Sequence, residues 1–380
     1  MTVVAERVSV ERVTDEHLPA LAGFYREVWD PEATVERVRA SRAAAAASNP
    51  VSPGEPPPTW VMLRGDRAIA HVTTIPITVW LNGHEHPAHW LKGLWVLPEF
   101  QRSSAGFLVL RAAVGALDRG LALVHEQAAI RLFTALGFTD LGALPNSLRV
   151  LRARSLLGRL DVNALGLGSL PAWARFGAQV ARHAAPVVGP LADAANAVWA
   201  GAATGPLGAF RVVNAQQLDR DAVEALWRAS RAEMPAAPAR DADSLARRYA
   251  YADYVFVEVR AGARLAGLAV VKRPRGAGDP RLRGIRVAPL ADLLYQPGEP
   301  RAGLAALRGA EAAARSFGAD ALLCGASSSA VQPLLGRRGC LPAPANLHVL
   351  ARFPAADGAM PATIAEWWFT RGDSEGDGMF

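Results

Sequence analysis

The sequence predicts an α/β protein with two domains, each a mixed and mostly antiparallel sheet flanked by helices. Three observations support this fold class. Strand patterns of period two alternate with helical patterns along the chain. The order of elements in residues 1–153 returns in residues 211–353. The chain of 380 residues is long enough for two or three domains, each with its own core.

Residues 1–153 predict a strand, two helices, three antiparallel strands, and then helix, strand, helix and strand. Asp15 caps the first helix and Pro31 opens the second. The Asn82-Gly83 pair is typical of a two-residue hairpin turn and joins the last two antiparallel strands. The strands are expected at residues 8–13, 60–64, 68–80, 88–97, 121–124 and 148–151, and the helices at 15–28, 32–47, 107–117 and 128–138.

The segment 94–106 joins an apolar strand to a helix through a loop of small residues. Pro98 ends the strand, and Ser103 to Gly106 lead into the helical pattern. The first N–H groups of a helix have no intrahelical acceptor, and the helix dipole favours an anion beside them. Small side chains let a phosphate approach the backbone. The segment therefore predicts a phosphate-binding loop.

Two motifs in this domain resemble the GNAT superfamily of acyl-CoA-dependent N-acyltransferases. The family's loop, Arg/Gln-x-x-Gly-x-Gly/Ala, is similar to Gln101-x-x-Ser104-x-Gly106, in which Ser replaces one Gly. The family's Ala-x-x-x-Tyr-x-x-x-Gly-Phe is met by residues 129–138, with Phe133 in the place of Tyr. The resemblance implies the GNAT fold for this domain and acetyl-CoA, or another acyl-CoA, as cosubstrate.

The resemblance also implies roles for individual residues. Backbone N–H groups around Trp95 and Val96 are expected to polarise the thioester carbonyl, and the loop is expected to hold the pyrophosphate. The residues expected at the cosubstrate are Trp95, Val96, Gln101, Arg102, Ser103, Ser104, Ala105, Gly106 and Phe133.

The general acid of the reaction is the open point of this resemblance. Phe133 cannot donate a proton, so the acid that the family often places there is missing. His125 and Glu126, just past the strand at 121–124, are the candidates for catalytic acid or base. The alternative role for both residues is to cap the next helix in solvent.

The second half repeats the plan of the first without its phosphate loop. Its helices are expected at residues 221–230, 243–249, 302–317 and 330–335, and its strands at 254–260, 265–272, 285–294, 321–324 and 348–353. Where the loop would stand, Glu299 would repel a pyrophosphate and two prolines remove amide donors. We expect that this half does not bind CoA, and that it shapes the acceptor site or stabilises the first half.

Two further segments complete the predicted organisation. Residues 154–210 form a connector with helical spacing at 173–184 and 191–199, expected as packing helices, with an amphipathic membrane-surface segment as the alternative. The tail, residues 354–380, carries Trp367-Trp368-Phe369 before an acidic run. We expect an aromatic anchor with a solvated acidic end. The alternative places Asp373 or Glu375 in a cleft between the domains, where it binds an amine.

Composition excludes several classes of function. The net charge is +6, but the arginines are scattered among acids rather than gathered with aromatics, so nucleic acid is not an expected partner. The excess of Arg over Lys indicates a GC-rich, bacterial genome. Cys324 and Cys340 are too few for a disulfide framework or a Cys-based zinc site. Since the histidines at 71–89 are separated by the hairpin turn, we expect no metal site.

No apolar stretch is long enough to cross a membrane, and the N-terminus lacks a signal-peptide pattern, so we expect a cytoplasmic protein. The sequence predicts an N-acyltransferase that transfers acetyl from acetyl-CoA to a primary amine of a small molecule, an amino sugar being the first candidate. One alternative is a non-catalytic acyl-CoA-binding or scaffold protein, which Phe133 and Ser104 favour. The other is an aminoacyl-tRNA-dependent ligase of the tandem GNAT fold. The acceptor, the acyl length and the oligomeric state stay open.

Overall fold

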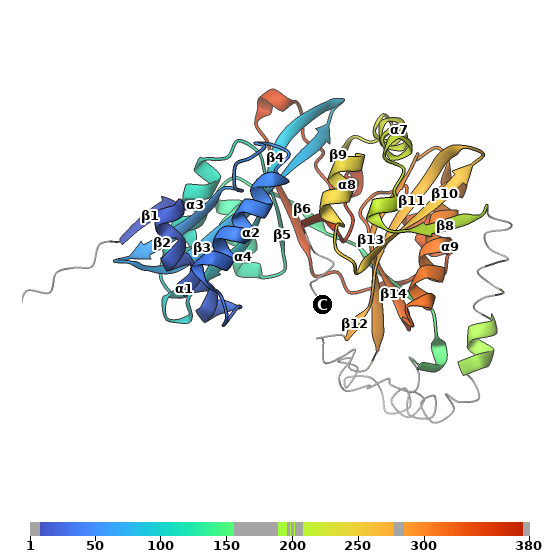
Figure 1. The fold of residues 1–380 in the computed structure, drawn as a ribbon. Helices are drawn as coiled ribbons and strands as arrows, with labels where there is room; N and C mark the ends of the chain where they lie inside the picture. The colour runs from blue at the N-terminus through green and yellow to red at the C-terminus, as the bar shows by residue number, and fades with distance from the viewer. Residues whose placement is uncertain are drawn as a thin grey trace, which may run out of the picture. The chain divides into compact units, whose positions relative to one another are not determined.

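The computed structural model describes residues 8–155, 189–195, 198, 201, 208–276 and 285–374 (Figure 1). The chain divides into two compact units, which we describe one at a time. Unit 1 comprises Met1–Ala143 and Leu347–Ala362, and unit 2 comprises Leu144–Asn346 and Thr363–Phe380. Each unit therefore includes a segment from the other half of the sequence.

Unit 1 is built on one sheet with the strand order β1-β2-β3-β4-β5-β16-β6. Among these strands, β4 and β5 run parallel and the other neighbours pair antiparallel. The strands are β1 (Val8–Arg12), β2 (Thr59–Arg64), β3 (Arg67–Leu81), β4 (His84–Val96), β5 (Gly120–Val124), β6 (Thr139–Ala143) and β16 (His348–Arg352). The helices are α1 (Leu18–Val28), α2 (Val35–Ala47), α3 (Ala105–Gly115) and α4 (Gln127–Ala135), with short 3₁₀ turns η1 (Asp15–His17) and η2 (Pro98–Phe100).

The core of unit 1 lies on both faces of this sheet. Trp60, Val61 and Met62 are consecutive in β2 and all buried, although neighbouring side chains in a strand point to opposite faces. Helices must therefore cover both faces. The expected hairpin forms at Asn82-Gly83, where both residues have positive φ (51° and 87°), as a two-residue turn of this type requires.

Unit 2 repeats this plan with the strand order β15-β7-β14-β13-β11-β10-β8. Its one parallel pair among the described strands is β13 with β14. The strands are β7 (Asn146–Val150), β8 (Phe210–Val213), β9 (Ala236–Pro238), β10 (Tyr254–Ala261), β11 (Arg264–Lys272), β12 (Arg275–Gly276), β13 (Arg286–Tyr295), β14 (Ala321–Gly325) and β15 (Leu341–Ala343). The helices are α7 (Arg220–Arg231), α8 (Ala242–Arg248), α9 (Pro300–Ser316) and α10 (Gln332–Arg337), and the 3₁₀ turns of unit 2 include η4 (Ala215–Gln217) and η7 (Ile364–Glu366). A further 3₁₀ turn, η6 (Ala355–Asp357), belongs to unit 1. The predicted fold class is confirmed.

Each unit contains one strand that the sequence order would assign to the other. β7 pairs antiparallel with β14 of unit 2, and β16 pairs with β5 and β6 of unit 1. The sequence predicts that the strands at 148–151 and 348–353 close the sheets of their own halves, within the domains 1–153 and 211–353, and this assignment is wrong. Both strands are only five residues long and mix polar with apolar side chains, Asn-Ser-Leu-Arg-Val in β7 and His-Val-Leu-Ala-Arg in β16, so their patterns do not specify one sheet over the other. Only Leu144 and Pro145 separate β6 from β7, and β16 takes the place beside β6.

The expected connector, residues 154–210, lies mostly outside the described residues, including the helix at 173–184. The described residues 189–195 are helical and overlap the second connector helix expected at 191–199. In the part of the chain that the structure describes, no helix combines the length and apolarity needed to span a membrane.

Candidate functional site

The candidate site in unit 1 begins where the parallel strands β4 and β5 separate. They pair from His89–Leu91 with Gly120–Ala122. Beyond these residues β4 continues to Val96 and β5 to Val124 with no further pairing between them in the described structure. Separated strands leave backbone N–H and C=O groups facing the space between them. We call this space the wedge of unit 1.

A β-bulge interrupts β4 beside the wedge. The register to β3 runs from His71 opposite Trp95 to Thr73 opposite Lys92, so two residues of β4, Gly93 and Leu94, oppose one of β3. Gly93 has φ of 60°, in the left-handed region that glycine adopts without strain.

The register decides which amides of β4 face the wedge. Leu97 N–H donates to Ile69 O on β3 at 3.0 Å, and in an antiparallel pair alternate residues point to the same neighbour. Trp95 N–H therefore points to β3, whereas Val96 N–H points to the wedge. Of the two amides that the sequence nominates, Val96 has the orientation that a carbonyl in the wedge would need. Gln101 Nε2 donates to Val96 O at 3.4 Å on the same side.

The predicted phosphate loop is exposed and leads directly into α3. Residues 101–104 are exposed, and Ser104 precedes the first helical residue without making a side-chain capping bond. Ser103 Oγ accepts from Ala105 N at 3.2 Å, so this amide already has an acceptor. The N–H groups of Gly106 and Phe107, in the first turn of α3, have no acceptor within the helix and are the ones available to an anion.

The two irregular positions of the motifs differ in their consequences. Ser104 has φ of −77°, a conformation open to any residue, so the exchange of Gly for Ser causes no backbone strain. Phe133 is 3% exposed and its ring meets that of Phe138 in an edge-to-face contact at 5.1 Å. Phe133 is thus a core residue of unit 1 that carries no proton to give.

The candidate acid and base lie on the turn after β5. Their side chains are exposed, 52% for His125 and 70% for Glu126, and His125 Nε2 lies 3.8 Å from Glu126 Oε1. Glu126 occupies the N-cap position of α4 but makes no capping hydrogen bond with its side chain. Exposure at the carboxyl end of β5 leaves both side chains open to a ligand in the wedge, and their roles stay predictions.

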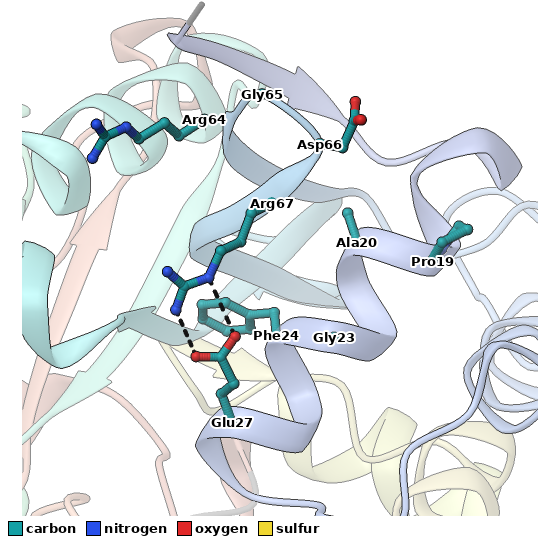
Figure 2. A pocket seen from close by; sticks show the side chains of 9 residues that line it. All are labelled: Pro19, Ala20, Gly23, Phe24, Glu27, Arg64, Gly65, Asp66 and Arg67. Atoms are coloured by element: carbon teal, nitrogen blue, oxygen red, sulfur yellow. Dashed lines mark hydrogen bonds and ion pairs between the residues drawn. The ribbon is translucent and has the colours of Figure 1, made fainter. Parts of the chain in front are cut away.

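A cavity of about 590 Å³ lies beside α1 in unit 1 (Figure 2). It is lined by Pro19, Ala20, Gly23, Phe24 and Glu27 of α1 and by Arg64, Gly65, Asp66 and Arg67 around the β2–β3 turn. Arg67 donates to Glu27 at 2.7 Å and to Glu99, next to the phosphate loop, at 2.8 Å. No residue from 101 to 106 lines this cavity, so the hollow and the predicted loop are separate features.

The corresponding wedge of unit 2 is filled by the tail of the chain. The parallel register of β13 and β14 ends at Leu290 opposite Cys324. Directly beyond it, Gly372 N–H donates to Ala291 O of β13 at 2.7 Å, and Arg371 N–H donates to Gly325 O of β14 at 2.9 Å. The tail therefore hydrogen-bonds to both strands at the point where they separate.

The aromatic residues of the tail are anchored, as expected. Trp367, Trp368 and Phe369 are at most 2% exposed, and Trp368 Nε1 donates to Leu293 O at 2.9 Å. The expectation of a solvated acidic end is wrong for Asp373, which is 2% exposed, and Glu375 lies outside the described residues.

A buried ion cluster holds Asp373 in place. Arg240 bonds Asp292 at 2.7 Å and Asp373 at 2.8 Å, and Arg248 bonds Asp373 at 2.8 Å and Asp292 at 3.2 Å. Tyr249 Oη donates to Asp292 at 2.9 Å. Burial raises the pKa of Asp292, but the two guanidinium groups lower it more, so this pKa lies below its usual value. The carboxylate of Asp373 is thus hydrogen-bonded to two arginines. The alternative interpretation of the tail, in which Asp373 binds an amine ligand, assigned this carboxylate a different partner.

The start of α9 in unit 2 already carries carboxylates. Glu233 Oε2 accepts from Gly298 N at 2.8 Å, and Glu299 precedes Pro300 at the helix start. A phosphate group here would meet negative charge and lose one donor to Pro300. In the described residues no group of three or more potential metal-ligating side chains occurs.

Comparison with known proteins gives one family and a set of similar folds. Residues 20–138 match the family model described as Acetyltransferase (GNAT) family. A search of the curated proteins finds no significant match. Solved structures with a similar fold include a probable N-acyltransferase from Enterococcus faecalis, with a TM-score of 0.56 and 10% identity over 91% of this chain and 72% of that one.

Two other solved structures are similar over nearly the whole chain. The GCN5-related N-acetyltransferase from Kribbella flavida has a TM-score of 0.54 at 14% identity, over 94% of this chain and 73% of that one. The Saccharomyces cerevisiae N-myristoyltransferase with bound myristoyl-CoA has a TM-score of 0.55 at 11% identity, over 97% of this chain and 86% of that one. At these identities the likeness concerns the fold, which has two similar units in this chain. Residues 20–138 form a domain of the acetyltransferase (GNAT) family.

Proposed function

We propose that unit 1 is an acyl-CoA-dependent N-acyltransferase that moves acetyl from acetyl-CoA to the primary amine of a small molecule. The observation that carries this proposal is the wedge of unit 1 with the exposed loop of residues 101–104 that leads into α3. The Gly106 and Phe107 amides would bind the pyrophosphate, and Val96 N–H would meet the thioester carbonyl in the wedge.

The chemistry needs little from side chains. The neutral amine attacks the thioester carbon, a C–N bond forms, and the carbonyl oxygen becomes an oxyanion that backbone N–H groups stabilise. Collapse breaks the C–S bond and releases the CoA thiolate, while the amine nitrogen loses a proton. His125 and Glu126 are the proposed acceptors of that proton. A thiol of pKa about 8.5 leaves without obligatory protonation, which is compatible with Phe133 in the place of a Tyr acid.

A non-catalytic acyl-CoA-binding role is the second candidate, because Phe133 is buried in the core and offers no acid. The exposed loop at α3 supports a CoA site over the aminoacyl-tRNA-dependent ligase. Amino sugars are the first acceptors to examine, and the structure names none.

Isothermal titration with acetyl-CoA, followed by thiol release across a panel of amines that includes amino sugars, tests the proposal. We expect one acetyl-CoA per chain and amine-dependent release of CoA. Binding without release on any amine would favour the non-catalytic role, and no binding would contradict both.

A further inference from the structure

His71 is a buried histidine that the reaction scheme above does not use. It stands on β3 opposite the bulge of β4 and is 1% exposed. Its Nδ1 lies 3.0 Å from Gly93 O, and its Nε2 lies 3.1 Å from Tyr25 Oη of α1. Rings of Phe24, Tyr25 and Trp29 surround the imidazole, with centroids 5.4 to 5.8 Å away.

The two hydrogen bonds fix the tautomer of His71. A carbonyl oxygen can only accept, so Nδ1 carries the proton and donates to Gly93 O. Nε2 is then the acceptor, and Tyr25 O–H donates to it. Burial lowers the pKa of His71 to about 4 and raises that of Tyr25 to about 12, so both groups are neutral near pH 7. The nearby charges are the cations Arg42 and Lys92, which also disfavour an imidazolium.

The bond to Gly93 O sets the direction of the next amide. In a planar trans peptide the C=O of one residue and the N–H of the next point in opposite directions. Because His71 draws Gly93 O towards itself, the N–H of Leu94 points away from His71, to the side of β4 where the wedge lies. Gly93 is exposed and sits in a bulge, so neighbouring ladder bonds do not hold this peptide plane by themselves.

We propose that His71, oriented by Tyr25, is a positioning residue that holds the Gly93–Leu94 peptide with the Leu94 N–H aimed at the thioester oxygen. Leu94 N–H thereby joins Val96 N–H as a donor to the oxyanion. The inference rests on the proposed function of unit 1. His71 neither touches the substrate nor moves a proton, since both ring nitrogens are engaged.

The variant His71→Leu removes the donor to Gly93 O. Loss of one oxyanion donor costs about 10²–10³ in kcat, and for a donor that is present but misdirected we expect a loss of about tenfold or more. The KM for acetyl-CoA changes little, because the phosphate loop is untouched. His71→Asn retains an N–H near the Nδ1 position and restores most of the rate. His84→Leu, at the exposed end of the β3–β4 hairpin in the same unit, is the control and leaves kcat unchanged.

A second readout does not depend on the acceptor. The infrared carbonyl band of acetyl-CoA, labelled with ¹³C at the thioester, moves to lower frequency when N–H donors polarise it. We expect this shift in the binary complex of the wild-type protein, its reduction in His71→Leu, and its recovery in His71→Asn. Tyr25→Phe keeps the Nδ1–H donor but removes the hydrogen bond that holds the ring at Nε2, so the imidazole orients Gly93 O less firmly and the shift is reduced in part.

The outcomes separate the two proposals. A full shift in His71→Leu with acetyl-CoA bound overturns the positioning role alone. A wild-type shift without turnover on any amine contradicts the proposed function and leaves the positioning role standing. If His71→Leu does not fold, Tyr25→Phe decides, because an unchanged band in that variant overturns the role of His71. If the wild-type protein does not bind acetyl-CoA, both proposals fall.

Discussion

The wedges of unit 1 and unit 2 are the same feature of the fold put to opposite uses. Each lies where one parallel pair separates within a mostly antiparallel sheet, and each has a bulge in the first strand of that pair. In unit 1 the carbonyl at the bulge, Gly93 O, accepts from His71. In unit 2 the corresponding carbonyl, Ala291 O, accepts from Gly372 of the tail.

The difference bears on the proposed cosubstrate site of unit 1, because a shared fold does not by itself determine such a site. For a cosubstrate to bind, the wedge must not be filled by another segment of the chain. The amides at the start of the following helix must also lack other acceptors. Unit 1 keeps Gly106 and Phe107 without side-chain acceptors, whereas in unit 2 Glu233 takes the amide of Gly298 and Pro300 has none. Four predictions test this contrast, starting with the largest expected effect.

Removal of the tail after Ala362 should abolish the cooperative fold of unit 2. The truncated chain retains every strand of both sheets but leaves the wedge of unit 2 without its filling. Deletion of even one buried Trp or Phe side chain costs about 3–5 kcal/mol, and the tail contributes three of them to a domain whose whole stability is about 5–15 kcal/mol. Urea unfolding followed by hydrogen exchange over β10–β14 measures the loss, and a full-length unfolding curve in the truncated protein would refute it.

Asp373→Ala should destabilise unit 2 by about 3–5 kcal/mol, because removal of one partner leaves buried arginines with too little negative charge. The control variant is Asp241→Ala, which removes only an N-cap of α8 and should cost about 1 kcal/mol. Asp253→Ala is less suitable as a control, because Asp253 borders the same sheet. Chemical denaturation of both variants gives the comparison. Equal losses would mean that Asp373 contributes no more to stability than a helix cap.

Gly106→Glu should weaken acetyl-CoA binding at least 100-fold, about 2.7 kcal/mol, while unit 1 stays folded. The carboxylate enters the first turn of α3, where the pyrophosphate is proposed, and the added Cβ lies 3.2 Å from Val96 Cγ2. The matched change in unit 2 is Arg301→Glu, also at the second residue of its helix, α9. Isothermal titration should find that variant unchanged, and similar losses in both would place the CoA site elsewhere.

Unit 1 should lose stability at a higher pH than unit 2. The pKa of His71 falls from 6.5 to about 4 through burial, so the unfolded chain binds more protons than the native one between these values. Stability is fully present above pH 6.5 and is lost as pH falls towards 4, by up to about 3 kcal/mol at 1.36 kcal/mol per unit. His89, with a pKa also lowered to about 4, acts in the same direction.

In unit 2 the lowered pKa of Asp292 stabilises the native state. This contribution is lost only as the pH falls below the pKa of an unfolded Asp, about 3.9. Hydrogen exchange read separately over β3 and over β13, from pH 7 to pH 4, follows the two units. His71→Asn should flatten the dependence in unit 1, and parallel losses in the two units would contradict the assignment.

The sequence predicts the elements well where the pattern is local. The Asn82-Gly83 turn, the loop before α3 and the repeated plan depend on residues close together in the chain. The strand exchange escapes prediction because β7 and β16 suit either sheet. The site is predicted in part: the loop of residues 101–106 is visible in a motif, but His71 is distinguished only by contacts to Gly93 and Tyr25, which lie 22 and 46 residues away. The burial of Asp373 depends equally on distant arginines.

The exchange of β7 and β16 also affects how the protein can be made. A ribosome completes β5 and β6 early, yet the strand that joins them, β16, emerges only after nearly all of unit 2 has been synthesised. Until residue 352 is available, the nascent chain displays two unpaired strand edges, which are the surfaces most prone to aggregation. A gene fragment cut at residue 153 would keep those edges permanently open and would carry β7 without its partner. Unit 1 obtains a complete sheet only from a chain that extends to residue 352.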